Sequence, residues 1–313
     1  MEVIRISAIA LAPLIVFMAL GYFFKKRNYM NEKTTRQLNI ICFRFFLSVM
    51  CGETVYKANL KENVDFLPAI IVGCGIVGVF LIAWIIVPRF IKDKTQIPVM
   101  IQGVYKANYA ILGITLSQSL CSGQDLGVIS LIAVILVPLN NAISAFIFEK
   151  YTGNATSVGS LIIKIIKNPL VVGSMLGIIL NVTGVVIPSW IMTGIVAKIS
   201  ALATPLSMIA LGASFEFGFI RKYKHEIFWA CLGKLVILPA VLIPITIALG
   251  VRHVGLVGVM IFAAAPNAVN SYSTAVAMGG DADLANEIVV MSSILSMATM
   301  FITFVIVGST VGF

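Results

Sequence analysis

The stretch that decides the fold is Ala265-Pro266-Asn267-Ala268-Val269-Asn270-Ser271-Tyr272-Ser273-Thr274. It lies inside an apolar segment, 254–278, that is long enough to cross a bilayer. Pro266 has no N–H and clashes with the preceding turn, so we expect the helix to break there. Asn267, Asn270 and Ser271 lie near the carbonyls that the break frees, and Tyr272 is a further candidate for binding a solute. The stretch therefore predicts a discontinuous transmembrane helix with a solute-binding site at its broken point.

The composition places most of the chain in lipid. Of the 313 residues, 59% are hydrophobic and 11% are charged, and the mean hydropathy is +1.03. A soluble domain carries roughly 25% charged residues, so this sequence cannot build a water-soluble surface. We predict an all-α integral membrane protein with ten transmembrane helices near 3–24, 38–57, 65–87, 97–120, 126–148, 169–185, 190–215, 226–250, 254–278 and 286–311.

The basic residues of the predicted loops gather on one side of the membrane. That side holds Lys25, Lys26, Arg27, Lys33, Arg36, Arg89, Lys92, Lys94, Lys150, Lys164, Lys167, Arg221, Lys222 and Lys224. The other side holds only Arg5, Lys57, Lys61 and Arg252. The positive-inside rule makes the first side cytoplasmic and both termini extracellular, with the cell membrane as the location. The net charge of +9 thus comes from basic residues in the cytoplasmic loops. The sequence has no basic stripe interleaved with aromatic residues, which would have indicated nucleic-acid binding.

The sequence predicts no cofactor, metal site or catalytic set. The five cysteines show no CxxC spacing, and the two histidines lie in loops on opposite predicted faces. The sequence contains no GxxxxGK[ST] phosphate loop, the motif that would indicate ATP hydrolysis, so we expect no enzyme activity. The loop Gly279-Gly280-Asp281 has an ordinary explanation, in which the glycines end one helix and Asp281 or Asp283 caps the next.

The two halves of the sequence match each other. Leu20-Gly21 corresponds to Leu176-Gly177, Leu47-Ser48 to Leu206-Ser207, and Asn108 to Asn267, the last two at the same offset. Residues 1–148 are predicted to form a first five-helix repeat and residues 169–313 a second, joined by an interfacial linker helix at 149–168. The second repeat begins after an odd number of helices, so it is inverted relative to the first, which is typical of transporters.

The counterpart of the broken segment is Tyr105-Lys106-Ala107-Asn108-Tyr109. It lacks a proline, so we attribute its predicted break to Gly103, Gly113 or local hydrogen bonding. Lys106 lies near the middle of a span. It can neutralise a substrate carboxylate, replace a bound cation, or reach the interface by snorkelling.

The predicted second helix holds two further candidates. Ser48 shares a helical face with Arg44, four residues away. Glu53 is predicted to be the most deeply placed acid and is the candidate for proton coupling. The alternatives are a place near the outer surface and a static pair with a lysine. In the fifth helix, Asn140 and Asn141 either line a cavity or bond between helices.

The sequence Pro266-Asn267-Ala268-Val269-Asn270-Ser271-Tyr272, followed by Gly279-Gly280-Asp281 and Leu284-Ala285, resembles the auxin efflux carrier family. The bacterial branch of this family is often described as malate or malonate permeases, within the bile-acid/arsenite transporter superfamily. Asn108-Tyr109 with Gly113 resembles the family's fourth helix, and the resemblance covers essentially the whole chain.

The resemblance implies a scaffold domain of helices 1, 2, 6 and 7 and a transport domain of helices 3–5 and 8–10. It implies that the broken helices 4 and 9 cross where an organic anion binds. Asn108 and Asn267 would then flank the crossing, and Ser48 would face the substrate from the scaffold.

We therefore expect a secondary transporter, an efflux carrier or permease, of a small organic anion, with a carboxylate favoured, working by alternating access. Its expected partners are that anion and the lipid bilayer. Two alternatives stay open: a sodium-coupled carrier of bile-acid or arsenite type with cation sites at the crossing, and a membrane sensor that binds a ligand without moving it. The sequence also leaves open proton or sodium coupling and a homodimer.

Overall fold

The computed structural model describes residues 2–58, 65–109, 116–117, 120–121, 127–153 and 158–311. Within these ranges the chain forms helices and short connections, with no strand, which confirms the all-α prediction. Six helices in the described part are long and apolar enough to cross a membrane: Glu32–Tyr56, Leu67–Phe90, Val128–Tyr151, Ser189–Ser214, Lys224–Ala248 and Ala282–Thr310. Pro169–Val182 and His253–Ala264 are shorter apolar helices.

The first half of the chain contains α1 (Glu2–Lys26), α2 (Glu32–Ile41), the π-helix η1 (Cys42–Phe46), α3 (Leu47–Tyr56), α4 (Leu67–Phe90), α5 (Gln96–Tyr105) and α7 (Gly127–Tyr151). The helix α8 (Val158–Ile166) lies in the predicted linker. The second half contains α9 (Pro169–Val182), α10 (Ser189–Ile191), η2 (Met192–Val196), α11 (Ala197–Ser214), α12 (Phe217–Lys222), α13 (Lys224–Leu232), η3 (Gly233–Ile237), α14 (Leu238–Ala248), α15 (His253–Ala264), α16 (Asn270–Met278) and α17 (Ala282–Thr310).

The second span begins earlier than hydropathy predicts. The sequence indicated a start near 38, whereas α2 begins at Glu32. Asn31 caps it, because its side-chain oxygen accepts the N–H of Thr34 at 2.8 Å. The first turns are polar and therefore invisible to a hydropathy window, although Asn31 is a typical N-cap residue.

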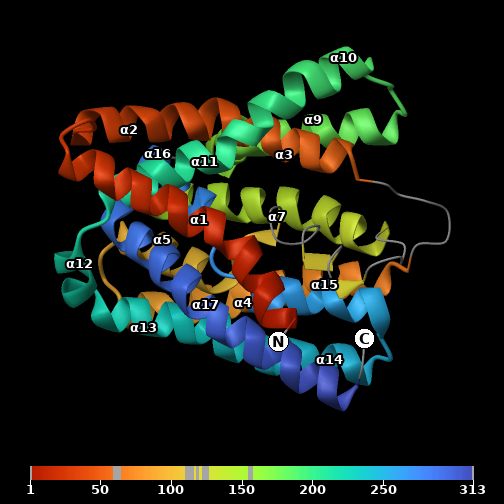
Figure 1. Cartoon of the computed structure of the whole chain (residues 1–313). Coiled ribbons are helices and arrows are strands. Elements are labelled where there is room, and N and C mark those ends of the chain that lie inside the picture. Colours follow the sequence, from red (N-terminus) through yellow and green to blue (C-terminus); the bar gives the residue numbers. More distant parts are fainter. Residues whose placement is uncertain are drawn as a thin grey trace.

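The helices pack in two groups, with α7 between them (Figure 1). In one group α1 lies along α11 and α3 lies along α9. In the other, α4 contacts α5, α14 and α15, and α17 contacts α13, α15 and α16. Contacts of α7 with α3, α9, α5 and α15 join the groups, and so do direct contacts of α1 with α17 and of α2 with α16.

Glycines allow the first group to pack closely. A Cβ at Gly21 of α1 would overlap the carbonyl oxygen of Ile209, and one at Gly212 of α11 would overlap that of Met18. The α3–α9 pair has the same arrangement, since a Cβ at Gly177 would overlap the carbonyl oxygen of Gly52. Close backbone approach through small residues is a main source of helix association in lipid, where no hydrophobic effect separates the helices from their solvent.

The turn between α16 and α17 has the predicted caps. Gly279 ends α16 in the left-handed conformation, with φ 76°, and Asp281 caps α17 by accepting the N–H of Leu284 at 3.0 Å. The Asp281 carboxylate also accepts the Tyr223 hydroxyl at 2.9 Å and the Gln96 side-chain amide at 3.1 Å. Burial raises the pKa of Tyr223, which keeps it a donor. Asp281 thus joins the starts of α5, α13 and α17.

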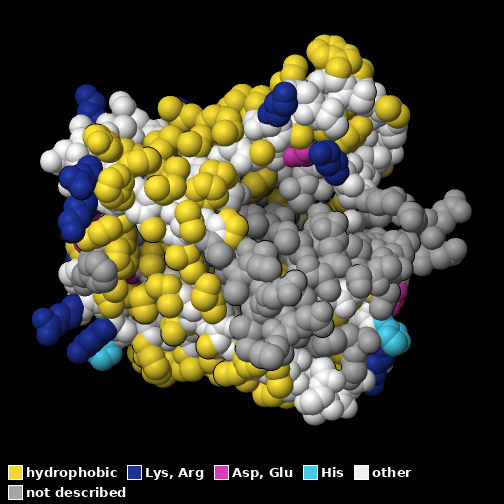
Figure 2. Space-filling view, in the orientation of Figure 1, with side chains coloured by type: hydrophobic (Ala, Val, Ile, Leu, Met, Phe, Trp, Pro, Cys, Tyr) yellow, Lys and Arg dark blue, Asp and Glu magenta, His cyan; other side chains and the backbone are white. Residues whose placement is uncertain are grey.

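The surface agrees with a membrane protein. Figure 2 shows hydrophobic side chains over most of the visible face that is described, while many Lys and Arg residues gather at the end where α12 and the start of α2 lie. We call this the basic end. Along α4, the apolar side chains of Ile82, Ile85, Ile86 and Phe90 are each at least 46% exposed. Water would disfavour such a surface and lipid favours it.

We predict that Gly212→Ala lowers the free energy of unfolding by about 1–3 kcal/mol, because the new methyl group must push α1 away from α11. Gly78→Ala in α4 is the matched control, since no atom lies within 4 Å of its added Cβ. That variant should keep or slightly raise stability, because alanine is the better helix former. Thermal unfolding in detergent measures both, and equal stability of the two variants would contradict the close packing.

Candidate functional site

Two interrupted helices meet inside the molecule. The helix α15 ends at Ala264 and α16 begins at Asn270, so the break predicted at Pro266 is present. The helix α5 ends at Tyr105, and Lys106 continues in extended conformation. The backbone N–H of Asn108 donates to the carbonyl of Pro266 at 3.0 Å. We call residues 106–108 and 265–269 together the crossover.

Asn267 fixes the crossover to its neighbours. Its side-chain amide donates to the carbonyl of Gln102 in α5 at 3.1 Å. Its backbone N–H donates to the hydroxyl of Ser292 in α17 at 3.1 Å. Asn267 is 1% exposed, so both bonds are made in the interior. A backbone that has left the helix therefore finds its partners in side chains, as the absence of water requires.

Lys234 supplies a further partner. It lies in the π-helix η3 and is fully buried. Its ammonium donates to the carbonyl of Phe262 at 2.9 Å and that of Ala263 at 3.4 Å. Both carbonyls belong to the last turn of α15, so the lysine caps the broken end of this helix.

A small cavity of about 40 Å³ adjoins the crossover. We call it the crossover cavity. Its walls come from α3, α7, α11 and the crossover: Leu47, Met50, Cys51, Thr54, Lys106, Ala107, Asn108, Leu136, Val137, Asn140, Asn141, Thr204, Ala268, Val269 and Asn270. Lys106 is the one charged residue among these lining residues, and no acid is among them. The start of α16 also borders the cavity, and a helix N-terminus favours negative charge.

Several polar atoms of the crossover cavity have no hydrogen-bond partner among the described residues. They are the ammonium of Lys106, the amide nitrogen of Asn108, and the amide oxygens of Asn140 and Asn270. Lys106 is only 1% exposed. Buried polar groups are normally paired, and an unpaired buried charge is expensive. The cavity therefore presents free donors and acceptors to a polar solute.

The other candidates on the crossing segments, Tyr109, Ser271 and Tyr272, are not among the described residues that line this cavity. Among them, Tyr109 is buried, with its hydroxyl 3.5 Å from the carbonyl of Ile129. Ser271 is buried, and its hydroxyl is unpartnered among the described residues. Tyr272 shares a hydrogen bond with Ser214. Gly113, predicted to help break the fourth helix, lies outside the described residues.

Ser48 and Glu53 lie elsewhere. Both line a separate groove between α3 and α9, together with Arg44 and Tyr56. The Ser48 hydroxyl donates to the carbonyl of Phe43 at 3.2 Å. Arg44 and Ser48 share a face as predicted, but the face of α3 that borders the crossover cavity is the one carrying Leu47, Met50, Cys51 and Thr54.

Glu53 is not the most deeply placed acid. It is partly exposed and forms an ion pair with Lys57 at 2.5 Å, the static alternative. Glu287 in α17 is fully buried, and both of its carboxyl oxygens lack a hydrogen-bond partner among the described residues. Sequence reasoning missed it because its position in the first turns of a helix has an ordinary electrostatic explanation.

Asn140 lines the cavity, which is one of its two predicted roles, and Thr54 and Thr204 also line it although neither was predicted as a site residue. A helical spacing of three and four along 47, 50, 51 and 54 was the available signal. Asn141 combines both of its predicted roles. It lines the cavity and donates to the Ser174 hydroxyl of α9 at 3.0 Å.

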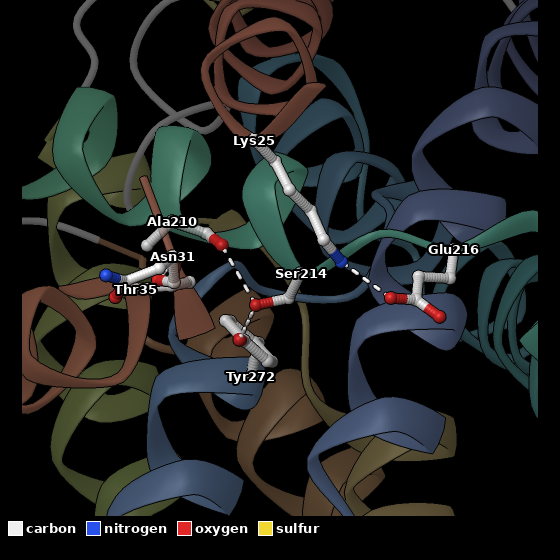
Figure 3. Close-up of polar contacts among 7 residues, drawn as sticks. All are labelled: Lys25, Asn31, Thr35, Ala210, Ser214, Glu216 and Tyr272. Atoms are coloured by element: carbon white, nitrogen blue, oxygen red, sulfur yellow. Dashed lines mark hydrogen bonds and ion pairs between the residues drawn. The ribbon is translucent and has the colours of Figure 1, made fainter. Parts of the chain in front are cut away.

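Towards the basic end, α16 is bonded to the other helix group. Figure 3 shows the Ser214 hydroxyl of α11 between the carbonyl of Ala210 and the hydroxyl of Tyr272. The Ser273 hydroxyl donates to Asn39 of α2 at 3.0 Å. Nearby, Lys25 pairs with Glu216 at 2.6 Å, also seen in Figure 3. The bonds of Tyr272 and Ser273 hold the two helix groups together on this side of the cavity, whereas the Lys25–Glu216 pair joins α1 to the connection after α11.

Comparison with known proteins gives the class. The sequence model of a family described as membrane transport protein matches residues 6–304. The chain belongs to this family, which is the auxin efflux carrier-like family that the crossing segments resemble.

Curated relatives are similar over most of their length. An uncharacterized transporter of Methanothermobacter thermautotrophicus is 25% identical over 293 residues, covering 91% of this chain and 93% of the relative. The uncharacterized transporter YfdV of Escherichia coli K12 is 26% identical over 253 residues, covering 76% of this chain and 77% of the relative. The protein is accordingly a membrane transporter.

We predict that Ser292→Ala destabilises the protein by about 1–3 kcal/mol, because it leaves the buried N–H of Asn267 without an acceptor. Ser293→Ala is the matched control. Ser293 is equally buried on the same helix, but its hydroxyl donates only to the carbonyl of Val289. Denaturant or thermal unfolding in detergent compares them, and equal losses would argue against the role of Ser292 in fixing the crossover.

Proposed function

We propose that this protein is a secondary transporter of a small organic anion, a carboxylate, which works by alternating access at the crossover. One observation carries the proposal. The bond from the Asn108 N–H to the Pro266 carbonyl joins two broken spans beside a cavity whose single charged lining residue is Lys106. Discontinuous helices that meet in this way form the substrate sites of many secondary transporters.

The chemistry of the crossover cavity favours an anion. The unpartnered ammonium of Lys106 can form a charge-assisted hydrogen bond, and the amide nitrogen of Asn108 supplies a second donor. The N-terminus of α16 adds positive potential from the same side. Apolar walls from Leu136, Val137 and Met50 suit the carbon skeleton of an organic solute.

The size of the cavity indicates a closed conformation. About 40 Å³ accommodates a few water molecules at most, so a carboxylate enters only when the walls separate. Its walls belong to both helix groups, α3 and α11 on one side and α7 with the crossover on the other. A relative movement of the two groups therefore opens it, after the Ser214–Tyr272 and Asn39–Ser273 bonds have broken.

We propose ten spans in an inverted five-plus-five repeat, with residues 1–148 and 169–313 as the repeats and 149–168 as the linker. Two packing pairs support it: α1 with α11 and α9 with α3 are each held by close glycine contacts, as an exchange of the repeats requires. In this proposal α1, α2–α3, α9 and α10–α11 form the scaffold. The helices α4, α5, α7, α13–α14, α15, α16 and α17 form the transport domain.

The basic end supports a cytoplasmic position for α12 and for the connection from α1 to α2, with extracellular termini. The bonds of Tyr272 and Ser273 then close the cavity on its cytoplasmic side. For proton coupling, Glu287 suits the role of carrier better than Glu53, because a fully buried carboxyl that has no ion pair among the described residues is costly to ionise, whereas Glu53 already has Lys57.

Uptake into proteoliposomes tests the proposal. Purified protein should accumulate or exchange radiolabelled malate or malonate above the level of protein-free liposomes. Efflux from preloaded liposomes covers the other direction. If these and other carboxylates fail while a solute of another class is carried, the substrate proposal is wrong. If the protein binds a carboxylate but no flux occurs in either direction, the proposal of a transporter is wrong.

We predict that Lys106→Met weakens carboxylate binding about tenfold or more, since a hydrogen bond to a charged group contributes about 1.5–3 kcal/mol. The same change should raise thermal stability, because it removes an unpaired buried charge. Lys164→Met in α8 is the control. Lys164 is paired with Glu149. It lines neither the crossover cavity nor the groove between α3 and α9, so carboxylate binding should be unchanged. Lower stability with unaltered binding in Lys106→Met would contradict the site.

A further inference from the structure

The last turn of α15 has two carbonyls that the helix itself cannot satisfy. The carbonyl of Phe262 would accept from residue 266, but proline has no N–H. The carbonyl of Ala263 would accept from Asn267, but that N–H donates to Ser292 instead. These oxygens lie at a helix C-terminus, which carries partial negative charge, inside the protein. Such a place attracts a cation.

Lys234 fills this place. Its ammonium donates to both carbonyls, at 2.9 Å and 3.4 Å, and lies 4.9 Å from the centre of the Phe262 ring. The side chain is fully buried. No carboxylate forms an ion pair with it among the described residues. Its charge therefore faces carbonyl oxygens, which are the groups that also coordinate metal cations in ion channels. The Phe262 ring adds a cation–π contact.

The π-helix η3 explains how the lysine reaches this point. Residues 233–237 form one widened turn within an otherwise α-helical span from Lys224 to Ala248. Such a turn changes the direction of the side chains that follow and often marks a functional site. The turn contacts α15, α17 and α5, the helices that carry and surround the crossover.

We propose that Lys234 is a tethered cation, which occupies at the broken end of α15 the place of a dissociable monovalent cation. The carbonyls that would otherwise bind sodium are held permanently by the ammonium. The crossover is therefore assembled without sodium, and removal of the amine creates a sodium site from the carbonyls of Phe262 and Ala263 with water as the remaining ligands. This inference holds whichever solute is carried, so it stands or falls separately from the carboxylate proposal.

The first test needs only the unchanged protein. Its unfolding temperature in detergent is measured in NaCl, KCl and choline chloride at equal ionic strength, with no substrate present. The three salts should give the same value. A specific rise in sodium would overturn the proposal, because it would show a cation site that Lys234 does not fill.

Two variants make the second test. Lys234→Ala removes the ammonium and leaves room for an ion and water, while Lys234→Met fills the same space with an apolar chain. Both should lower the unfolding temperature in choline, because two carbonyls lose their donor. Sodium should restore several degrees to Lys234→Ala only, and radioactive sodium should bind to that variant and not to Lys234→Met.

The outcomes separate clearly. Sodium rescue confined to Lys234→Ala supports the tethered cation. An equal response of the two variants, or a Lys234→Ala protein that unfolds in choline and in sodium alike, overturns it and leaves Lys234 as a hydrogen-bond donor only.

Discussion

The missing N–H of Pro266 is the constraint on which the rest of the structure depends. It ends α15 in the middle of the protein and leaves carbonyls that no water can reach. Each freed backbone group finds a partner in another helix. The ammonium of Lys234 donates to the carbonyls of the last turn, and the hydroxyl of Ser292 accepts the N–H of Asn267. The carbonyl of Pro266 itself accepts from Asn108 and so joins the second interruption to the first. Irregular backbone is tolerated in lipid only under these conditions.

The buried lysines Lys106, in the crossover, and Lys234, beside it, differ in whether their ammonium groups have hydrogen-bond partners. We assign their roles from that difference. Lys234 uses its donors on backbone carbonyls, whereas Lys106 has no partner among the described residues and borders the cavity. A paired cation stabilises the break, and an unpaired one is a cost that a ligand can remove. Among the described residues, Asn108 and Asn270 also have unpartnered side-chain atoms at the cavity, whereas Asn267 uses its amide nitrogen on α5 and leaves only its amide oxygen unpartnered.

Packing outside the crossover complements this picture. The α1–α11 and α3–α9 pairs are held by backbone-to-backbone contact at glycines, which leaves little freedom to slide. The helix α16 packs on α2, η1 and α11 of the scaffold, and the hydrogen bonds in this packing are Ser214–Tyr272 and Asn39–Ser273, each of which breaks at modest cost. A rigid frame and a separable partner are what alternating access requires, and the cavity lies between them.

The sequence by itself determined the all-helical membrane class, the break at Pro266, the caps at Gly279 and Asp281 and the family. Each follows from properties of residues close together in the chain: length of apolar runs, a missing N–H, a left-handed glycine and a side-chain cap. It misjudged the start of α2, because polar helical turns carry no hydropathy signal.

Only the tertiary structure decided which neighbour each helix face meets. Periodicity shows that Arg44 and Ser48 share a face of the second span, but not that this face borders a groove while Thr54 borders the crossover cavity. It could not show that Lys234 reaches the broken end of α15, or that Glu287, rather than Glu53, is fully buried without a partner. In lipid every apolar face is equally acceptable to its solvent, so contacts between distant residues are set by close packing and by the need to satisfy freed backbone groups.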